Sequence, residues 1–229
     1  MWCLRSVVSY ARSAVACRRA VLVALAVTYP ALGAAADVEV AVHDLNAQPL
    51  IDAVVFAEPV ATAAPPSRAT GHALIDQVNK EFVPLVTVVR VGTEVSFPNS
   101  DNIRHSIYSF SPAKPFAMKL YSGKQAPAVT FDKPGVVVLG CDIHDAMAAW
   151  VVVVDTPYFA KTSASGRAAL KGLAPGDYHV SVWYPSPTAA PSVSDLHIGA
   201  EGDAHLDVKV DGSASSLPAL RARAVQTKP

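Results

Sequence analysis

Short apolar runs, each the length of a β-strand and bounded by turn residues, are the feature that most constrains this chain. VEVAVHD (38–44), HSIYSF (105–110) and AHLDVKVD (204–211) alternate apolar and polar residues with a period of two. That period is typical of strands with one buried face. Stretches with a helical period are scarce, while Pro and β-branched residues are abundant. The sequence therefore predicts an all-β chain of the sandwich class.

The first 36 residues are typical of an export signal. Four arginines accompany an apolar run, Ala20–Gly33, and small residues follow up to Ala36, so we expect cleavage before Asp37. The run is too short to span a bilayer well, and Pro30 interrupts it. An Arg-Arg pair just before the run leaves a twin-arginine signal open, although we favour Sec export. We expect a periplasmic protein without a membrane span.

The charge of the remaining chain argues against one class of partner. Four of the 19 Lys and Arg residues, and none of the 19 Asp and Glu residues, lie in the export segment, which leaves the rest about four units negative. Binding to nucleic acid needs clustered basic side chains, and none are present. We therefore expect no nucleic-acid partner.

The cysteine content singles out one thiol. Cys3 and Cys17 belong to the export segment, so Cys141 is the only cysteine that remains. Cysteines of exported proteins normally occur in pairs. A lone thiol is either a small buried side chain or a group with its own chemistry, such as a metal ligand or a nucleophile.

Candidate metal ligands gather around that thiol. His144 and Met147 follow Cys141 in the stretch GCDIHDAM, and His105 begins another expected strand. One thiolate, two imidazoles and a weakly bound thioether form the donor set of type-1 (blue) copper. Thiolate and thioether favour Cu(I), while imidazole accepts both oxidation states. The combination points to copper.

Other chemistries of a single cysteine fit less well. A binuclear copper centre needs two cysteines, and structural zinc usually uses paired CxxC or HxxxH spacings. A cysteine protease needs a His and an Asn or Asp partner, and the three-residue separation of His144 from Cys141 suits shared metal binding better. The histidines that we assign to no metal are His43, His72, His179, His197 and His205.

The stretch Ala73–Val154 resembles a cupredoxin of the plastocyanin and amicyanin type. VPLVTVVRVGTEVSFPNSDNIRHSIYSF followed by FDKPGVVVLGCDIHDAMAAWVVVV has the order of that family: strand, His, strand, Cys-His-Met loop, strand. The short Cys-x2-His-x2-Met loop is similar to that of amicyanin. The resemblance implies a Greek-key β-sandwich and one type-1 copper ion with four ligands: His105, Cys141, His144 and Met147.

The resemblance also implies roles around the ligands. Asn99 falls where the family has an Asn that bonds across to the Cys loop, while an ordinary turn residue after Pro98 is the alternative. His144 is expected to be the partly exposed ligand through which the electron leaves. The apolar surface around it is expected to include Pro112, Pro115, Phe116, Ala146 and Ala148.

The two flanks resemble halves of a carboxypeptidase-regulatory-like sandwich. GRAALKGLAPGDY matches the second half, and we expect a hairpin around Pro175 and Gly176. A separate N-terminal hairpin and a separate C-terminal sandwich are the alternative. The expected division is a signal peptide at 1–36, the first part of the sandwich at 37–66, a cupredoxin domain at 67–155, the second part at 156–211 and a flexible tail at 212–229.

The chain also resembles exported, plastocyanin-like methylamine utilisation proteins, a name that describes gene neighbourhood and establishes no role in amine oxidation. The resemblance implies an electron carrier with transient redox partners, monomeric and not an enzyme. Copper handling as a chaperone or sensor is one alternative, although only Met118 and Met147 follow the initiator Met. A cell-envelope interaction protein, in which the flanks bind a partner, is the other.

Overall fold

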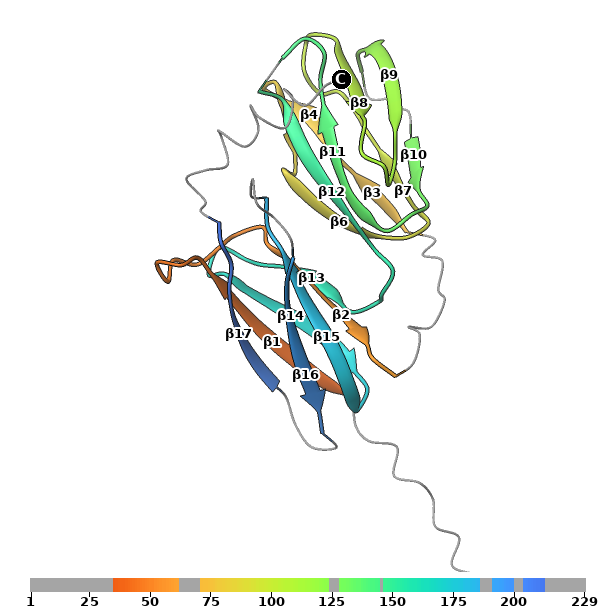
Figure 1. The fold of residues 1–229 in the computed structure, drawn as a ribbon. Coiled ribbons are helices and arrows are strands. Elements are labelled where there is room, and N and C mark those ends of the chain that lie inside the picture. Colours follow the sequence, from red (N-terminus) through yellow and green to blue (C-terminus); the bar gives the residue numbers. More distant parts are fainter. Residues whose placement is uncertain are drawn as a thin grey trace, which may run out of the picture. The chain divides into compact units, whose positions relative to one another are not determined.

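The computed structural model describes residues 35–61, 71–123, 128–144, 146–185, 191–199 and 204–212. Every regular element in these ranges is a β-strand (Figure 1), so the predicted all-β class is confirmed. Among these residues, no helix has the length and apolarity needed to cross a membrane. The expected export signal and flexible tail lie almost entirely outside the described residues.

Residues 72–154 form what we call the central sandwich. Its strands are β3 (His72–Leu74), β4 (Asp76–Val78), β5 (Glu81–Val83), β6 (Val86–Arg90), β7 (Thr93–Ser96), β8 (His105–Ser109), β9 (Phe116–Tyr121), β10 (Ala128–Phe131), β11 (Gly135–Gly140) and β12 (Ala148–Val154). The larger sheet has the order β6-β12-β11-β8-β9, and a smaller one has the order β10-β7-β3 (Figure 1). β4 pairs with β5.

The core of the central sandwich follows from the alternation of its strands. Leu139 of β11 and Val151 of β12 are fully buried together with Phe97 and Phe131. Burying one such side chain contributes roughly 1.5–3 kcal/mol. The same cluster includes Cys141, so the core extends to the loop that follows β11.

A second, flanking sandwich combines strands from both sides of the central segment in sequence. Its strands are β1 (Ala36–His43), β2 (Val54–Pro59), β13 (Phe159–Lys161), β14 (Arg167–Leu173), β15 (Gly176–Trp183), β16 (Ser192–Ile198) and β17 (Ala204–Lys209). β1 lies between β14 and β17, and β2 lies between β13 and β15, with β16 at the edge (Figure 1). These pairings support the proposal of one split module, whose boundaries and likeness to a carboxypeptidase-regulatory-like sandwich remain a proposal.

The expected hairpin around Pro175 and Gly176 is wrong. β14 pairs with β1 and β15 pairs with β2 and β16, so the two strands lie in different sheets. Leu170 of β14 and Val180 of β15 are buried in the same core cluster. The turn therefore connects two sheets that cover one core. The prediction failed because the alternation of residues along a strand shows which face is buried and not which strand is its partner.

Candidate metal centre

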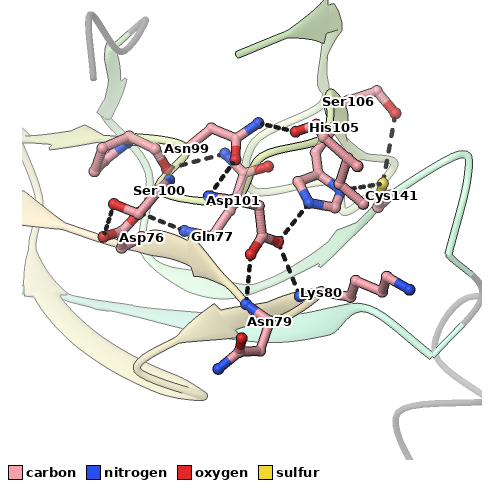
Figure 2. A network of polar contacts seen from close by, with 12 residues as sticks. Asp76, Gln77, Asn79, Lys80, Asn99, Ser100, Asp101, His105, Ser106 and Cys141 are labelled. Atoms are coloured by element: carbon pink, nitrogen blue, oxygen red, sulfur yellow. Dashed lines mark hydrogen bonds and ion pairs between the residues drawn. The ribbon is translucent and has the colours of Figure 1, made fainter. Parts of the chain in front are cut away.

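The candidate site begins at a strand that is buried on both faces. All five residues of β8 are buried, although His105, Ser106 and Ser109 are polar. A buried polar side chain requires partners. His105 is 0% exposed; its Nε2 lies 2.7 Å from Oδ2 of Asp101, and its Nδ1 lies 3.8 Å from Sγ of Cys141. The two ring nitrogens thus face two different groups (Figure 2).

A glycine brings Cys141 close to β8. Gly140 is the last residue of β11 and lies opposite Tyr108 of β8. A Cβ atom at position 140 would lie 2.5 Å from Cζ of Tyr108, so a larger residue would displace the ring. Cys141 follows directly and is 1% exposed.

Ser106 fastens the loop after Cys141 to β8. Its hydroxyl donates to Oδ2 of Asp142 and accepts a hydrogen bond from the backbone N–H of Asp142, both at 3.0 Å. The same oxygen lies 3.9 Å from Sγ of Cys141. Since Ser106 is the neighbour of His105, these bonds set the position of the thiol relative to the imidazole.

The rest of the loop carries the other two candidate ligands. The backbone N–H of Met147 donates to the carbonyl of His144 at 2.8 Å, which closes a tight turn. The Met147 side chain is fully buried in the cluster that contains Cys141, whereas His144 is half-buried. The rings of His105 and His144 meet edge to face, with centroids 5.1 Å apart.

The distances among the donor atoms fit a single ion. One ligand atom each from His105, Cys141 and His144 can be chosen so that all three lie within 4.8 Å of one another. Metal–ligand bonds of about 2.0–2.3 Å place neighbouring ligand atoms roughly 3.4–3.8 Å apart. The separation of 3.8 Å between Nδ1 of His105 and Sγ of Cys141 is within reach of that geometry.

The chemical state of His144 also fits a ligand. Its Nδ1 is buried and has no hydrogen-bond partner among the described residues. A buried nitrogen without a partner is costly unless something binds it. Burial, followed by electrostatic interactions with His105 and Lys80, lowers the pKa of His144. This shift favours the neutral imidazole, which is the form that binds metals.

The expected role of Asn99 needs correction. Its side-chain amide donates to the carbonyls of Ile103 and Tyr121, both at 2.9 Å, and its Oδ1 accepts from the N–H of Asp101 at 3.0 Å. Two of these bonds lie within the segment before β8, and the bond to Tyr121 connects that segment to β9. The bond across to the Cys loop is made by Ser106 instead, because Ser106 lies on the strand that faces the loop.

Sequence reasoning missed two residues of the site and misplaced one neighbour. Ser106 and Asp101 contact the candidate ligands, and their proximity to His105 in sequence was the only available signal, since loop geometry decides where such side chains point. Ala148, expected on the apolar surface near His144, is buried at the start of β12.

The remaining described histidines lie outside the cluster. His72 bonds to Oγ of Ser96, and His179 and His197 each bond to an aspartate on the neighbouring strand. The described part of the chain contains one group of three potential ligands from His, Cys, Asp and Glu, and it consists of His105, Cys141 and His144.

Comparisons with known proteins find solved structures that are similar to part of the chain. No protein-family model and no curated protein matches. A copper-containing nitrite reductase (NirK) from Thermus scotoductus is 28% identical over 43% of this chain, with a TM-score of 0.35, and the chain spans 25% of that enzyme. A purple cupredoxin from Nitrosopumilus maritimus is 23% identical over 36% of this chain and 99% of its own length, with a TM-score of 0.33.

A reduced Cu(I) form of an amicyanin variant is similar to the same extent. It is 22% identical over 43% of this chain and 98% of its own length, with a TM-score of 0.34. Because these likenesses are partial and weak, the case for a metal centre comes from the side chains described above.

Proposed function

We propose that this chain is a type-1 copper protein that carries single electrons between redox partners in the periplasm. The observation that carries the proposal is the convergence of the Cys141 sulfur with the imidazoles of His105 and His144. His105 and Cys141 are 36 residues apart in sequence, so only the fold brings them together. Export to the periplasm is supported by the arginines and apolar run of the N-terminal segment.

Burial and hydrogen bonds within the protein hold the candidate ligand residues in place. His105 and Met147 are 0% exposed and Cys141 is 1% exposed, and interiors of this kind are close-packed. Ser106 and Asp101 fix the thiol loop and the imidazole ring. A bound copper ion would supply a one-electron couple, Cu(II)/Cu(I). Ligands that cannot move keep the reorganisation on electron transfer small.

His144 gives the site a connection to the surface. It is half-buried, whereas the ligand residues on either side of it in the loop are buried, and the adjoining Ile143 is 50% exposed. A partner that docks at this loop would come close to the imidazole of His144. A small docking patch suits the transient encounters of redox proteins.

Four protein ligands also argue for a carrier over an enzyme. Catalytic metal sites keep an open position for water or substrate, whereas closed sites do not. With Met147 as the fourth donor, beside His105, Cys141 and His144, the donor set leaves no such position.

The test is the absorption spectrum of the purified protein during titration with Cu(II). We expect an intense visible band from thiolate-to-copper charge transfer and a reversible one-electron couple in voltammetry. Cys141→Ser and His105→Ala should abolish the band. His72→Ala is the matched control, because His72 lies in the same sandwich but bonds to Ser96, and this variant should retain the full band.

Three results would contradict the proposal. A full band in Cys141→Ser would remove the thiolate from the site, and loss of the band in His72→Ala would place the metal elsewhere. Tight binding of Cu(I) without any coloured Cu(II) form would indicate copper handling in place of electron transfer.

A further inference from the structure

The Asp101 carboxylate contacts the candidate ligand His105 at the ring nitrogen that faces away from Cys141. Oδ2 of Asp101 lies 2.7 Å from Nε2 of His105, while Nδ1 of the same ring lies 3.8 Å from the sulfur of Cys141 (Figure 2). The His105 side chain is fully buried and that of Asp101 is 12% exposed, so water screens this pair little.

The turn between β4 and β5 fixes the position of the Asp101 carboxylate. The backbone N–H groups of Asn79 and Lys80 donate to Asp101 at 2.6 and 2.9 Å. Both residues have positive φ angles, 53° and 62°. Two successive N–H groups in this conformation form a concavity that binds anions. Asp101 is therefore fixed from one side by the backbone and from the other by His105.

Both carboxylate oxygens of Asp101 accept backbone hydrogen bonds, Oδ1 from the N–H of Asn79 and Oδ2 from the N–H of Lys80. Oδ2, which already accepts one N–H, also faces Nε2 of His105 and acts as an acceptor toward it. Nε2 of His105 must therefore carry the proton, which leaves the lone pair of Nδ1 directed at the cluster with Cys141 and His144.

We propose that Asp101 is a positioning residue that fixes His105 in the Nε2–H tautomer and biases the site toward Cu(II). This inference rests on the proposed copper function. A carboxylate bonded to a ligating imidazole fixes its orientation and raises its basicity. A nearby negative charge stabilises the ion of higher charge more strongly. Both effects lower the reduction potential of the Cu(II)/Cu(I) couple.

Asp76 provides a matched control for Asp101. It belongs to the same network of polar contacts, where its carboxylate accepts from the N–H of Gln77 at 2.7 Å and from the hydroxyl of Ser100 at 2.8 Å (Figure 2). Asp76→Asn removes the same charge beside the same hairpin without removing a partner of a ligand. A general effect of charge or local stability should appear in both variants, whereas an effect through His105 should appear only in Asp101→Asn.

The first experiment needs no copper. In ¹⁵N NMR spectra of the metal-free protein, we expect the His105 ring to carry its proton on Nε2, with a strongly downfield proton resonance. Asp101→Asn should move this resonance upfield and speed its exchange, because a hydrogen bond to a neutral acceptor is weaker. A proton on Nδ1 in the unaltered protein would overturn the inference.

The second experiment measures the potential with Cu(II) and Cu(I) bound. Loss of an outer-shell partner typically costs 10–100-fold in affinity. For Asp101→Asn we expect the ratio of Cu(II) to Cu(I) affinity to fall about tenfold, which raises the potential by about 59 mV for one electron. Asp101→Glu keeps the charge and should restore most of the difference, while Asp76→Asn should leave the potential nearly unchanged.

The outcomes separate the two proposals. Equal shifts in Asp101→Asn and Asp76→Asn, or no shift in either, would overturn the role of Asp101 while the copper function stands. If the unaltered protein shows no thiolate band with Cu(II), the copper function fails, and the NMR result then decides the tautomer by itself. If Asp101→Asn does not fold, the position of the ring proton of His105 in the unaltered metal-free protein remains the test.

Discussion

The central and flanking sandwiches are built from similar strands but place their polar side chains differently. In the central sandwich, His105, Asn99 and Gln77 are at most 2% exposed, and each has hydrogen-bond partners. In the flanking sandwich, His179 and His197 keep side-chain exposures of 52% and 73% and bond to aspartates at the surface.

The contrast shows that burial determines whether a His–Asp pair fixes the orientation of its imidazole. Both sandwiches contain His–Asp pairs, at 2.7 Å for His105 and Asp101 and at 2.6 Å for His197 and Asp177. Exposed pairs contribute about 0–1 kcal/mol because water screens them. A buried imidazole must instead have its partners supplied by the fold, so its orientation is fixed. Fixed orientation is what a metal ligand needs.

Substitutions in the two cores should have the largest effect on stability. Leu139 of the central sandwich and Leu170 of the flanking sandwich are both 0% exposed. Leu→Ala at either position should reduce the free energy of unfolding by about 2–5 kcal/mol, since it leaves a cavity. Urea denaturation followed by circular dichroism measures this loss, and Val193→Ala, at a position 60% exposed, is the control.

The visible band of the copper-loaded protein distinguishes the two core substitutions further. Leu170→Ala should leave the band unchanged under native conditions, because its cluster contains none of the candidate ligands. Leu139 lies two residues before Cys141 in the same cluster, so Leu139→Ala should also weaken copper binding. An equal effect of the two variants on the band would contradict the assignment of the site to one core.

Two tyrosines provide the next comparison, of intermediate size. The hydroxyl of Tyr121 donates to the carbonyl of Phe97 at 2.6 Å and accepts from the amide of Gln77 at 2.5 Å. That of Tyr184 is buried without a partner among the described residues. Tyr121→Phe should cost about 1–3 kcal/mol, whereas Tyr184→Phe should be neutral or stabilising. Equal losses in urea denaturation would show that hydrogen bonding is not the difference.

The same tyrosines predict a loss of stability at alkaline pH. Burial is the main cause that raises the pKa of Tyr121 and of Tyr184 to about 12. The ordinary value is about 10. Between these values the unfolded chain releases the proton and the folded protein keeps it, so the free energy of unfolding falls as pH rises from about 10 to 12.

Below about pH 10 this contribution is fully present, since both states are protonated. Urea denaturation across that range should show a smaller fall in either Tyr→Phe variant than in the unaltered chain. If the free energy of unfolding falls in both variants as much as in the unaltered chain, the alkaline loss belongs to other groups.

The smallest effect is expected for the exposed His–Asp pairs. His197→Ala removes a pair in which both side chains are mostly exposed. The change in unfolding free energy should be at most about 1 kcal/mol and should shrink in high salt. Thermal denaturation at two salt concentrations measures it, and a loss as large as that of the core variants would remove the distinction between exposed and buried pairs.

The sequence was sufficient for the fold class and for the candidate ligands. Strict alternation in stretches such as β1 and β17 depends on local residue order, and local order is readable without a structure. Cys141, His144 and Met147 were recognisable because a lone thiol is rare in a chain that is expected to be exported, and the other two residues follow within six positions. The structure brings Cys141 and His144 together with His105, and it buries Met147 in the same core.

Strand pairing and the partners of the ligands were not readable in this way. β14 and β15 are consecutive in sequence, yet they lie in different sheets. The two sheets pack face to face, so both strands bury residues in the same core. The roles of Ser106 and Asp101 depend on loops whose backbone angles set where each side chain points. Of the two expectations for Asn99, the bond to the Cys loop is not among its contacts, because its amide donates to the carbonyls of Ile103 and Tyr121.

By itself, the order of residues determined an all-β chain and the donor atoms available to a metal, because strand period and ligand chemistry are properties of neighbouring residues. Only the tertiary structure decided that β8 and the loop after β11 meet, and that Asp101 lies behind His105. These are contacts between distant or irregular segments, and their geometry follows from the packing of a whole core.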